Sequence, residues 1–144
     1  MALLYSDMAK KAGINLRVEK SPLDGYWNNV WMNKPMSMVF WYGRPTADAM
    51  FSTVYSSGSS WNDTYWKNEK FDQLLSAARV EMDEAKRKQM YFDLQSMVSD
   101  EGGAVIPVYS NLICAVSDKI AVKNRVSGES PLDGQRNASR WAPA

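Results

Sequence analysis

The chain has 144 residues, a formal net charge of +1, 45% hydrophobic residues and 23% charged residues, as expected of one globular domain. This balance predicts neither a nucleic-acid partner nor an anionic membrane surface as partner. The absence of His and the presence of a single Cys exclude a His-dependent triad, an intrachain disulfide and a Cys-rich zinc site. We therefore expect no metal site and no cofactor.

The first expected element is an amphipathic helix. Leu4, Met8 and Ala12 recur at spacings of four, and Gly13 follows as a left-handed stop. No charged segment precedes the apolar residues, so the N-terminus does not read as a signal peptide. No apolar run approaches the roughly 20 residues that span a bilayer. A chain that begins on a packed helix is expected to be a piece of a longer protein.

Two strands and a second helix are expected next. Alternating apolar residues predict a strand over 14–18, and the segment Ser21–Asp24 predicts a capped helix start. The almost continuously apolar run 36–42 predicts a strand buried on both faces. Helix, strand, helix and strand in this order predict a right-handed βαβ unit in a small sheet flanked by helices. The pentapeptide SPLDG of residues 21–25 recurs at 130–134, which we interpret as two uses of a turn signal.

A Ser/Gly loop with large aromatic residues is expected over 55–66, followed by a helical hairpin over 68–81 and 83–100 that ends at Gly102 and Gly103. The first helix carries the apolar stripe Phe71, Leu74, Leu75 and Ala78. The second carries the stripe Arg87, Met90, Tyr91, Leu94, Met97 and Val98.

Short strands are expected over 104–109 and 112–116. Pro107 cannot donate to a ladder, which makes its segment an edge strand or a crossing between lobes. Cys114 lies in an apolar stretch and is expected to be a buried small hydrophobe. From Lys119 onward the chain is expected to be a polar tail with Trp141 as a late anchor. The predicted domains are therefore 1–118 and 119–144.

No catalytic motif stands out: the sequence contains no GxSxG, P-loop or dinucleotide fingerprint. Asp48, Asp63 and Asp72 lie where caps and turns are expected. Ligand binding is better supported, because eleven of the seventeen aromatic residues lie between Tyr26 and Trp66. Those that flank loops suit either core packing or contact with a sugar ring or an extended peptide: Trp41, Tyr42, Trp61 and Trp66.

The stretch 61–111, WNDTYWKNEKFDQLLSAARVEMDEAKRKQMYFDLQSMVSDEGGAVIPVYSN, resembles the C-terminal part of bacterial ABC-importer solute-binding proteins of extracellular family 5, the peptide, oligopeptide and nickel type. The segments 9–28 and 40–48, AKKAGINLRVEKSPLDGYWN and FWYGRPTAD, resemble the same family. The shared positions are Asn68, Phe71, Asp72, Leu74, Leu75, Ala78, Arg79, Asp83, Arg87, Tyr91, Gln95, and Pro107 to Tyr109.

The resemblance implies an α/β, periplasmic-binding-protein-like (type II) fold. This chain would form most of its C-terminal lobe, and the N-terminal lobe of the same longer protein would form the other wall of the site. It also implies a small solute, a membrane permease as partner, a periplasmic location and no catalysis. Relatives that bind peptides often carry an Asp four residues before the loop Pro, where this chain has Trp41. The absence of His also leaves a His-ligated nickel site unsupported.

We therefore predict solute capture between two lobes, with seven wall and hinge residues: Trp41, Tyr42, Arg44, Trp61, Asn62, Tyr109 and Asn111. For Arg44, contact with a solute carboxylate and an ordinary exposed turn are both open. A severed lobe could also form a dimer. One alternative is a free-standing interaction domain that uses exposed aromatic residues. Another is a small glycosidase that uses Asp48 and Asp63, which would have to face one cleft.

Overall fold

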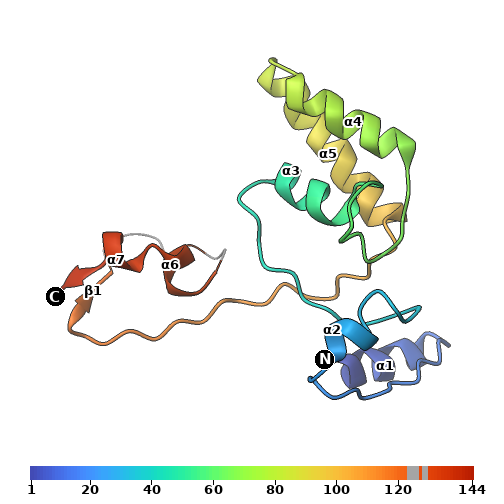
Figure 1. The fold of residues 1–144 in the computed structure, drawn as a ribbon, viewed down its shortest axis with the longest axis horizontal. Coiled ribbons are helices and arrows are strands. Elements are labelled where there is room, and N and C mark those ends of the chain that lie inside the picture. Colours follow the sequence, from blue (N-terminus) through green and yellow to red (C-terminus); the bar gives the residue numbers. More distant parts are fainter. Residues whose placement is uncertain (123–126, 128–129) are drawn as a thin grey trace. The chain divides into compact units, whose positions relative to one another are not determined.

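The computed structural model describes residues 1–122, 127 and 130–144. The chain divides into two units, residues 1–40 and 41–144. Figure 1 shows the elements in chain order, most of them helical, with a two-stranded sheet near the C-terminus. The described part of the chain is thus mixed helix with one small antiparallel sheet. The expected boundary between residues 118 and 119 stays a prediction.

The first unit begins with α1 (Ala2–Lys11), which confirms the expected N-terminal helix. Gly13 takes the left-handed conformation at φ +80°, and the Ile14 N–H donates to the Ala9 carbonyl at 3.0 Å, so the chain turns back where a Gly stop was expected. The apolar stripe of the helix remains exposed, however, since Leu4 and Met8 are each 60% exposed.

The expected strand over 14–18 is wrong, because the structure assigns no strand to these residues. The carbonyl of Leu16 instead accepts a hydrogen bond from Ser6 Oγ at 2.7 Å. The expected helix start at Ser21 is also wrong: α2 (Tyr26–Asn29) begins after Gly25, which has a φ of +76°. An alternating pattern records which side chains are apolar, but a strand forms only where a second strand supplies its hydrogen bonds.

The aromatic residues of α2 contact one another. The rings of Trp27 and Trp31 lie 5.7 Å apart, those of Trp27 and Phe40 lie 6.1 Å apart, and Tyr26 donates to the Met38 carbonyl at 2.8 Å. These edge-on contacts favour packing as the role of Trp27 and Trp31.

The expected buried strand over 36–42 and the βαβ unit built on it are also wrong. Residues 36–42 form no strand, and Phe40 and Tyr42 are exposed. The sheet found among the described residues pairs β1 (Ile120–Ala121) with β2 (Ala142–Pro143) in antiparallel fashion, with Ile120 opposite Pro143. Without a neighbouring parallel strand, an apolar run cannot form the sheet that its composition favours.

The second unit contains the core. Here α3 (Ala47–Met50) runs directly into η1, a short π-helix (Phe51–Tyr55), and α4 (Glu69–Val80) and α5 (Glu84–Glu101) form the expected helical hairpin. Both long helices begin at side-chain caps: Asn68 accepts from the Phe71 N–H at 3.1 Å, and Asp83 accepts from the Lys86 N–H at 3.0 Å. Gly102 ends α5, and Gly103 follows with a φ of +73°.

The core joins η1 to the hairpin. The buried side chains are Phe51, Val54, Tyr55, Phe71, Leu75, Ala78, Leu94 and Val98. This set confirms part of each stripe expected from the helical periodicity, and Leu74, Met90, Tyr91 and Met97 pack partly buried against it. The π-helix contributes three of the eight buried residues, which the sequence pattern did not indicate.

After α5 the chain has no regular structure until β1. The expected strands over 104–109 and 112–116 are absent (Figure 1), and Cys114, expected to be buried, is exposed. The C-terminal part also contains α6 (Pro131–Gln135) and α7 (Asn137–Arg140). Trp141, the expected anchor, is half-buried, and its indole N–H has no hydrogen-bond partner among the described residues. The expected tail also includes 123–126 and 128–129, which lie outside the described residues.

Candidate functional site

Four residues of the second unit form an aromatic and charged group, the Trp41 cluster: Trp41, Arg44, Trp61 and Asp63. The rings of Trp41 and Trp61 lie 5.9 Å apart and tilted by 41°. The guanidinium carbon of Arg44 lies 5.9 Å from the centre of the Trp41 ring, and the Trp41 indole N–H donates to Asp63 Oδ2 at 3.3 Å. A cation thus lies over one face of the indole while a carboxylate binds its polar edge.

Two local structures position this cluster. Arg44 donates to the Tyr42 carbonyl at 3.2 Å, which holds its side chain against the backbone two residues earlier. Two residues after Arg44, Thr46 caps α3 by accepting from the Ala49 N–H at 3.1 Å. The segment that carries Arg44 is therefore followed closely by a capped helix start.

The loop that carries Trp61 and Asp63 is organised by Asn62, which is only 5% exposed. Its Nδ2 donates to the carbonyls of Trp66 at 2.7 Å and Ser56 at 3.2 Å, and lies 3.4 Å from the Tyr55 carbonyl. Its Oδ1 accepts from Thr64 Oγ1 at 2.9 Å. Predicted as a wall residue, Asn62 directs its polar groups into its own loop and thereby fixes the residues on either side of it.

The predicted wall residues differ in exposure. Trp61 is 50% exposed and Tyr42 is 52% exposed, while Trp41 and Arg44 are half-buried. Trp66, the fourth loop-flanking aromatic residue, packs edge-on against the buried Phe71 with ring centres 5.0 Å apart. The structure therefore groups Trp41, Arg44 and Trp61 and assigns Trp66 to packing.

The two predicted hinge residues lie further along the chain. Tyr109 and Asn111 are both exposed. Burial raises the pKa of the Tyr55 phenol, and the charges of Asp63 and Tyr109 raise it further. Tyr109 thus acts electrostatically on a residue that Asp63 also influences.

Asp63 is the member of the cluster that the sequence did not assign to binding. It was expected to serve as a cap or turn residue or, in the alternative interpretation, as one carboxylate of a glycosidase pair. The available signal was its place two residues after Trp61 in a loop rich in aromatic residues, but a bond to Trp41, twenty-two positions away, has no local pattern.

The other carboxylate of that pair, Asp48, belongs to a separate polar group. Its Oδ1 accepts from Arg79 Nε at 2.8 Å and from the Tyr91 hydroxyl at 3.1 Å, while Arg79 also donates to Ser52 Oγ. Burial raises the pKa of Tyr91, and the hydrogen bond to Asp48 adds to this; the same carboxylate raises the pKa of Arg79. These bonds tie α3 and η1 to α4 and α5, so a structural role accounts for Asp48.

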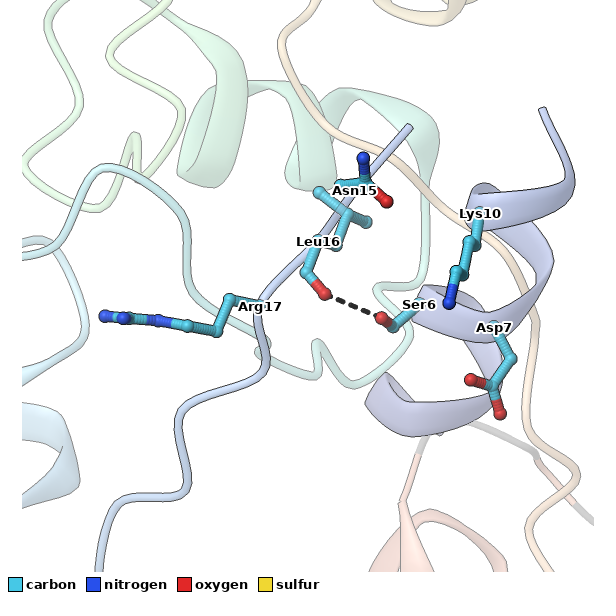
Figure 2. Close-up of a pocket in the computed structure, with 6 residues that line it drawn as sticks. All are labelled: Ser6, Asp7, Lys10, Asn15, Leu16 and Arg17. Atoms are coloured by element: carbon cyan, nitrogen blue, oxygen red, sulfur yellow. Dashed lines mark hydrogen bonds between the residues drawn. The ribbon is translucent and has the colours of Figure 1, made fainter. Parts of the chain in front are cut away.

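Two hollows of the surface lie elsewhere. One, of about 400 Å³, is open and is lined by residues of α1 and the segment after it: Ser6, Asp7, Lys10, Asn15, Leu16 and Arg17. Figure 2 shows this hollow, with the Ser6–Leu16 hydrogen bond between its two walls. The other, of about 280 Å³, lies beside Trp141. None of the predicted site residues lines either hollow.

Within residues 1–122, 127 and 130–144, no group of three or more acidic, His or Cys side chains is arranged to hold a metal ion. No helix in that part of the chain is both long and apolar enough to cross a membrane.

Part of the chain is similar to a known protein. A segment of 59 residues is 34% identical to the dipeptide-binding protein DppE of Bacillus subtilis (strain 168). The aligned segment covers 41% of this chain and 11% of that relative, so the chain spans a small part of its length. No protein-family profile matches the chain, and no solved structure matches it.

Proposed function

We propose that this chain is part of a solute-binding protein of an ABC importer and that it captures a peptide or another small polar solute without chemical conversion. The observation that carries the proposal is the 34% identity over 59 residues to a protein named as dipeptide-binding. The family resemblance of residues 9–28, 40–48 and 61–111 supports the same class of protein.

In this proposal the Trp41 cluster forms one wall of the site. Trp41 and Trp61 offer flat apolar faces, which suit the side chain or the backbone plane of a peptide. Arg44 and Asp63 place opposite charges on two sides of the Trp41 indole. Tyr42 extends the wall, Asn62 holds its loop, and Tyr109 and Asn111 lie near the hinge.

The second wall belongs to another lobe of a longer protein, of type II periplasmic-binding-protein fold. Solute contacts with both walls favour the closed state, and a membrane permease recognises that state. The location that follows is the periplasm. Such a mechanism requires no metal, cofactor or catalytic pair.

The test is calorimetric titration of the natural full-length protein with a set of dipeptides to pentapeptides, for the wild type and Trp41→Ala. Loss of a stacked aromatic contact of about 0.5–1.5 kcal/mol corresponds to a Kd weakened by about 2–10-fold. Trp27→Ala is the matched control, since Trp27 makes its ring contacts within the first unit, and we expect its Kd to be unchanged.

The outcomes separate the parts of the proposal. If Trp41→Ala binds the solute as the wild type does, the wall assignment is wrong. If no peptide of the set binds the wild-type protein, the solute class is wrong. Equal weakening by Trp27→Ala would mean that loss of any Trp disturbs the protein, and the Trp41 cluster would lose its special role.

A further inference from the structure

The segment 104–116, named here the extended segment, is unusual because most of its apolar side chains remain largely or half exposed, although Ala104 at its start packs against the core. Ile106, Val108, Leu112 and Val116 keep between 41% and 52% of their surface exposed, and Cys114 is exposed as well. No hydrogen bond joins the backbone of the extended segment to any other described residue. Figure 1 draws it without a helix or a paired strand. Unpaired backbone combined with apolar side chains is the property of an exposed edge strand.

We propose that the extended segment pairs with the same segment of a second copy of this chain, as two antiparallel β-strands centred on Ser110. This inference concerns the 144-residue chain and does not depend on solute binding. Three observations favour a second copy as the partner.

The first observation is the shortage of other strands. The sheet of the described residues consists of β1 and β2, each two residues long. Such a ladder offers no edge long enough for the extended segment. In a solution of this chain, the longest run of unpaired backbone that another copy supplies is its own extended segment. The irregular segments 14–22 and 37–44 are shorter, and side chains already bind their Leu16, Met38 and Tyr42 carbonyls.

The second observation is the distribution of charge. No charged residue lies between Glu101 and Asp118, so the paired stretch carries no repulsion. Asp100 and Glu101 precede it, whereas Asp118 and Lys119 follow it and cancel each other. Parallel pairing would place the acidic ends of both copies together, while antiparallel pairing places each acidic end beside a neutral one.

The third observation is the register. Two identical antiparallel strands related by a two-fold axis place one residue opposite itself. With Ser110 at that position, one face pairs Ala104 with Val116, Ile106 with Cys114 and Val108 with Leu112. Every apolar side chain of this face then meets another apolar side chain. A shift to Tyr109 as the centre would place Val108 opposite Ser110 instead.

Pro107 fits the same register. Hydrogen-bonded and non-hydrogen-bonded pairs alternate along an antiparallel ladder. If Ser110 forms a hydrogen-bonded pair with its copy, Pro107 and Ile113 form a non-hydrogen-bonded pair. The missing N–H of Pro107 then points away from the partner and costs no ladder bond.

Disulfide trapping tests this register directly. Ile106→Cys places a thiol opposite Cys114 of the second copy, within the Cα separation of about 4.4–6.8 Å that a disulfide needs. Within one extended chain, positions 106 and 114 lie about 26 Å apart, so the bond forms only between copies. After mild oxidation we expect a covalent dimer on a non-reducing gel, with the 106–114 peptide pair identified by mass spectrometry.

The cross-linking experiment has two controls. The wild-type chain has Cys114 alone, and the register separates the two copies of this residue, so it should remain uncrosslinked. Val105→Cys places its thiol on the opposite face and should also remain uncrosslinked. Equal cross-linking of Val105→Cys and Ile106→Cys would indicate random collision and would overturn the proposal, as would failure of Ile106→Cys to cross-link.

Sedimentation velocity supplies a second readout. We expect the wild-type chain to be dimeric, with Leu112→Pro raising the dimer Kd at least tenfold more than Ile113→Pro. Leu112 lies at a hydrogen-bonded position of the proposed ladder and Ile113 does not. Helical circular dichroism should be unchanged, because neither residue lies in a helix. A wild-type chain that sediments as a monomer, or two proline variants with the same effect, would refute the pairing.

Discussion

Replacing Asn62 tests whether the loop that carries Trp61 and Asp63 depends on one buried amide. The Asn62 amide donates its two protons to the carbonyls of Trp66 at 2.7 Å and Ser56 at 3.2 Å, and it accepts from Thr64 at 2.9 Å. Each such bond contributes about 0.5–1.5 kcal/mol, so Asn62→Ala should lower the free energy of unfolding by about 2–4 kcal/mol. That is a large part of the roughly 5–15 kcal/mol that stabilises a typical domain.

Asn62→Asp is the sharper variant, because it replaces the donor with a carboxylate that faces backbone carbonyls in a buried site. Burial and these carbonyl oxygens disfavour the charged form, so the pKa of the introduced carboxyl in the folded state rises above its unfolded value of about 3.9. Stability is then lowest at neutral pH and recovers, relative to the wild type, as the pH falls below the raised folded-state pKa. At pH 7 we expect the loss to be at least as large as for Asn62→Ala.

Urea denaturation followed by circular dichroism measures both effects. With a slope of about 1–3 kcal/mol per molar urea, the midpoint at pH 7 should fall by about 1–2 M for Asn62→Ala. Asn15→Asp is the matched control, since Asn15 is exposed and lies outside the extended segment, and this variant should unfold as the wild type does. If Asn62→Asp had the wild-type midpoint at pH 7, Asn62 would not be held in this network and the reasoning would fail.

Two further predictions concern the helices around the core. Leu94→Ala, at a side chain with 0% exposure, should lower the free energy of unfolding by about 2–5 kcal/mol in urea denaturation. Phe92→Ala, at a side chain 61% exposed on the same helix, should lower it by less than about 0.5 kcal/mol. If Phe92→Ala were the more damaging variant, the orientation of α5 would be wrong. Asp48→Asn should cost about 1 kcal/mol or less, since the side chains of the Arg79–Asp48 pair are 46% and 31% exposed. It should also lower the pKa of Tyr91, which the hydrogen bond to Asp48 now raises; an unchanged Tyr91 titration by NMR would show that this bond is absent.

The candidate site shows which of its residues could be predicted from residue type and loop position alone. Trp41, Arg44 and Trp61 were expected near one wall from their residue types and loop positions, and the structure groups them. Their role in solute binding stays a prediction. Asn62 was expected at the same wall, but its amide is used inside the loop. Residue type indicates hydrogen-bonding capacity, while the direction of a side chain depends on the surrounding chain.

The strand predictions failed for a related physical reason. Residues 14–18, 36–42, 104–109 and 112–116 carry β-type patterns, yet none forms a strand in the structure. The backbone N–H and C=O groups of a strand form their hydrogen bonds with a different segment of the chain. A local sequence pattern carries no information about whether such a segment is present. The backbone of 104–116 has no partner strand within the described residues. The proposed pairing of two copies would supply one.

The sequence by itself determined the elements whose hydrogen bonds are local. The helices α1, α4 and α5 lie where periodicity and capping residues indicated, with Asn68 and Asp83 at the starts of the hairpin helices, because each helical bond joins residues four apart. Only the tertiary structure decided which extended segments remain unpaired, and only it brought Trp41 to Asp63 across twenty-two positions. Such contacts depend on which distant segments meet when the core forms, and a short stretch of sequence does not specify its distant partner.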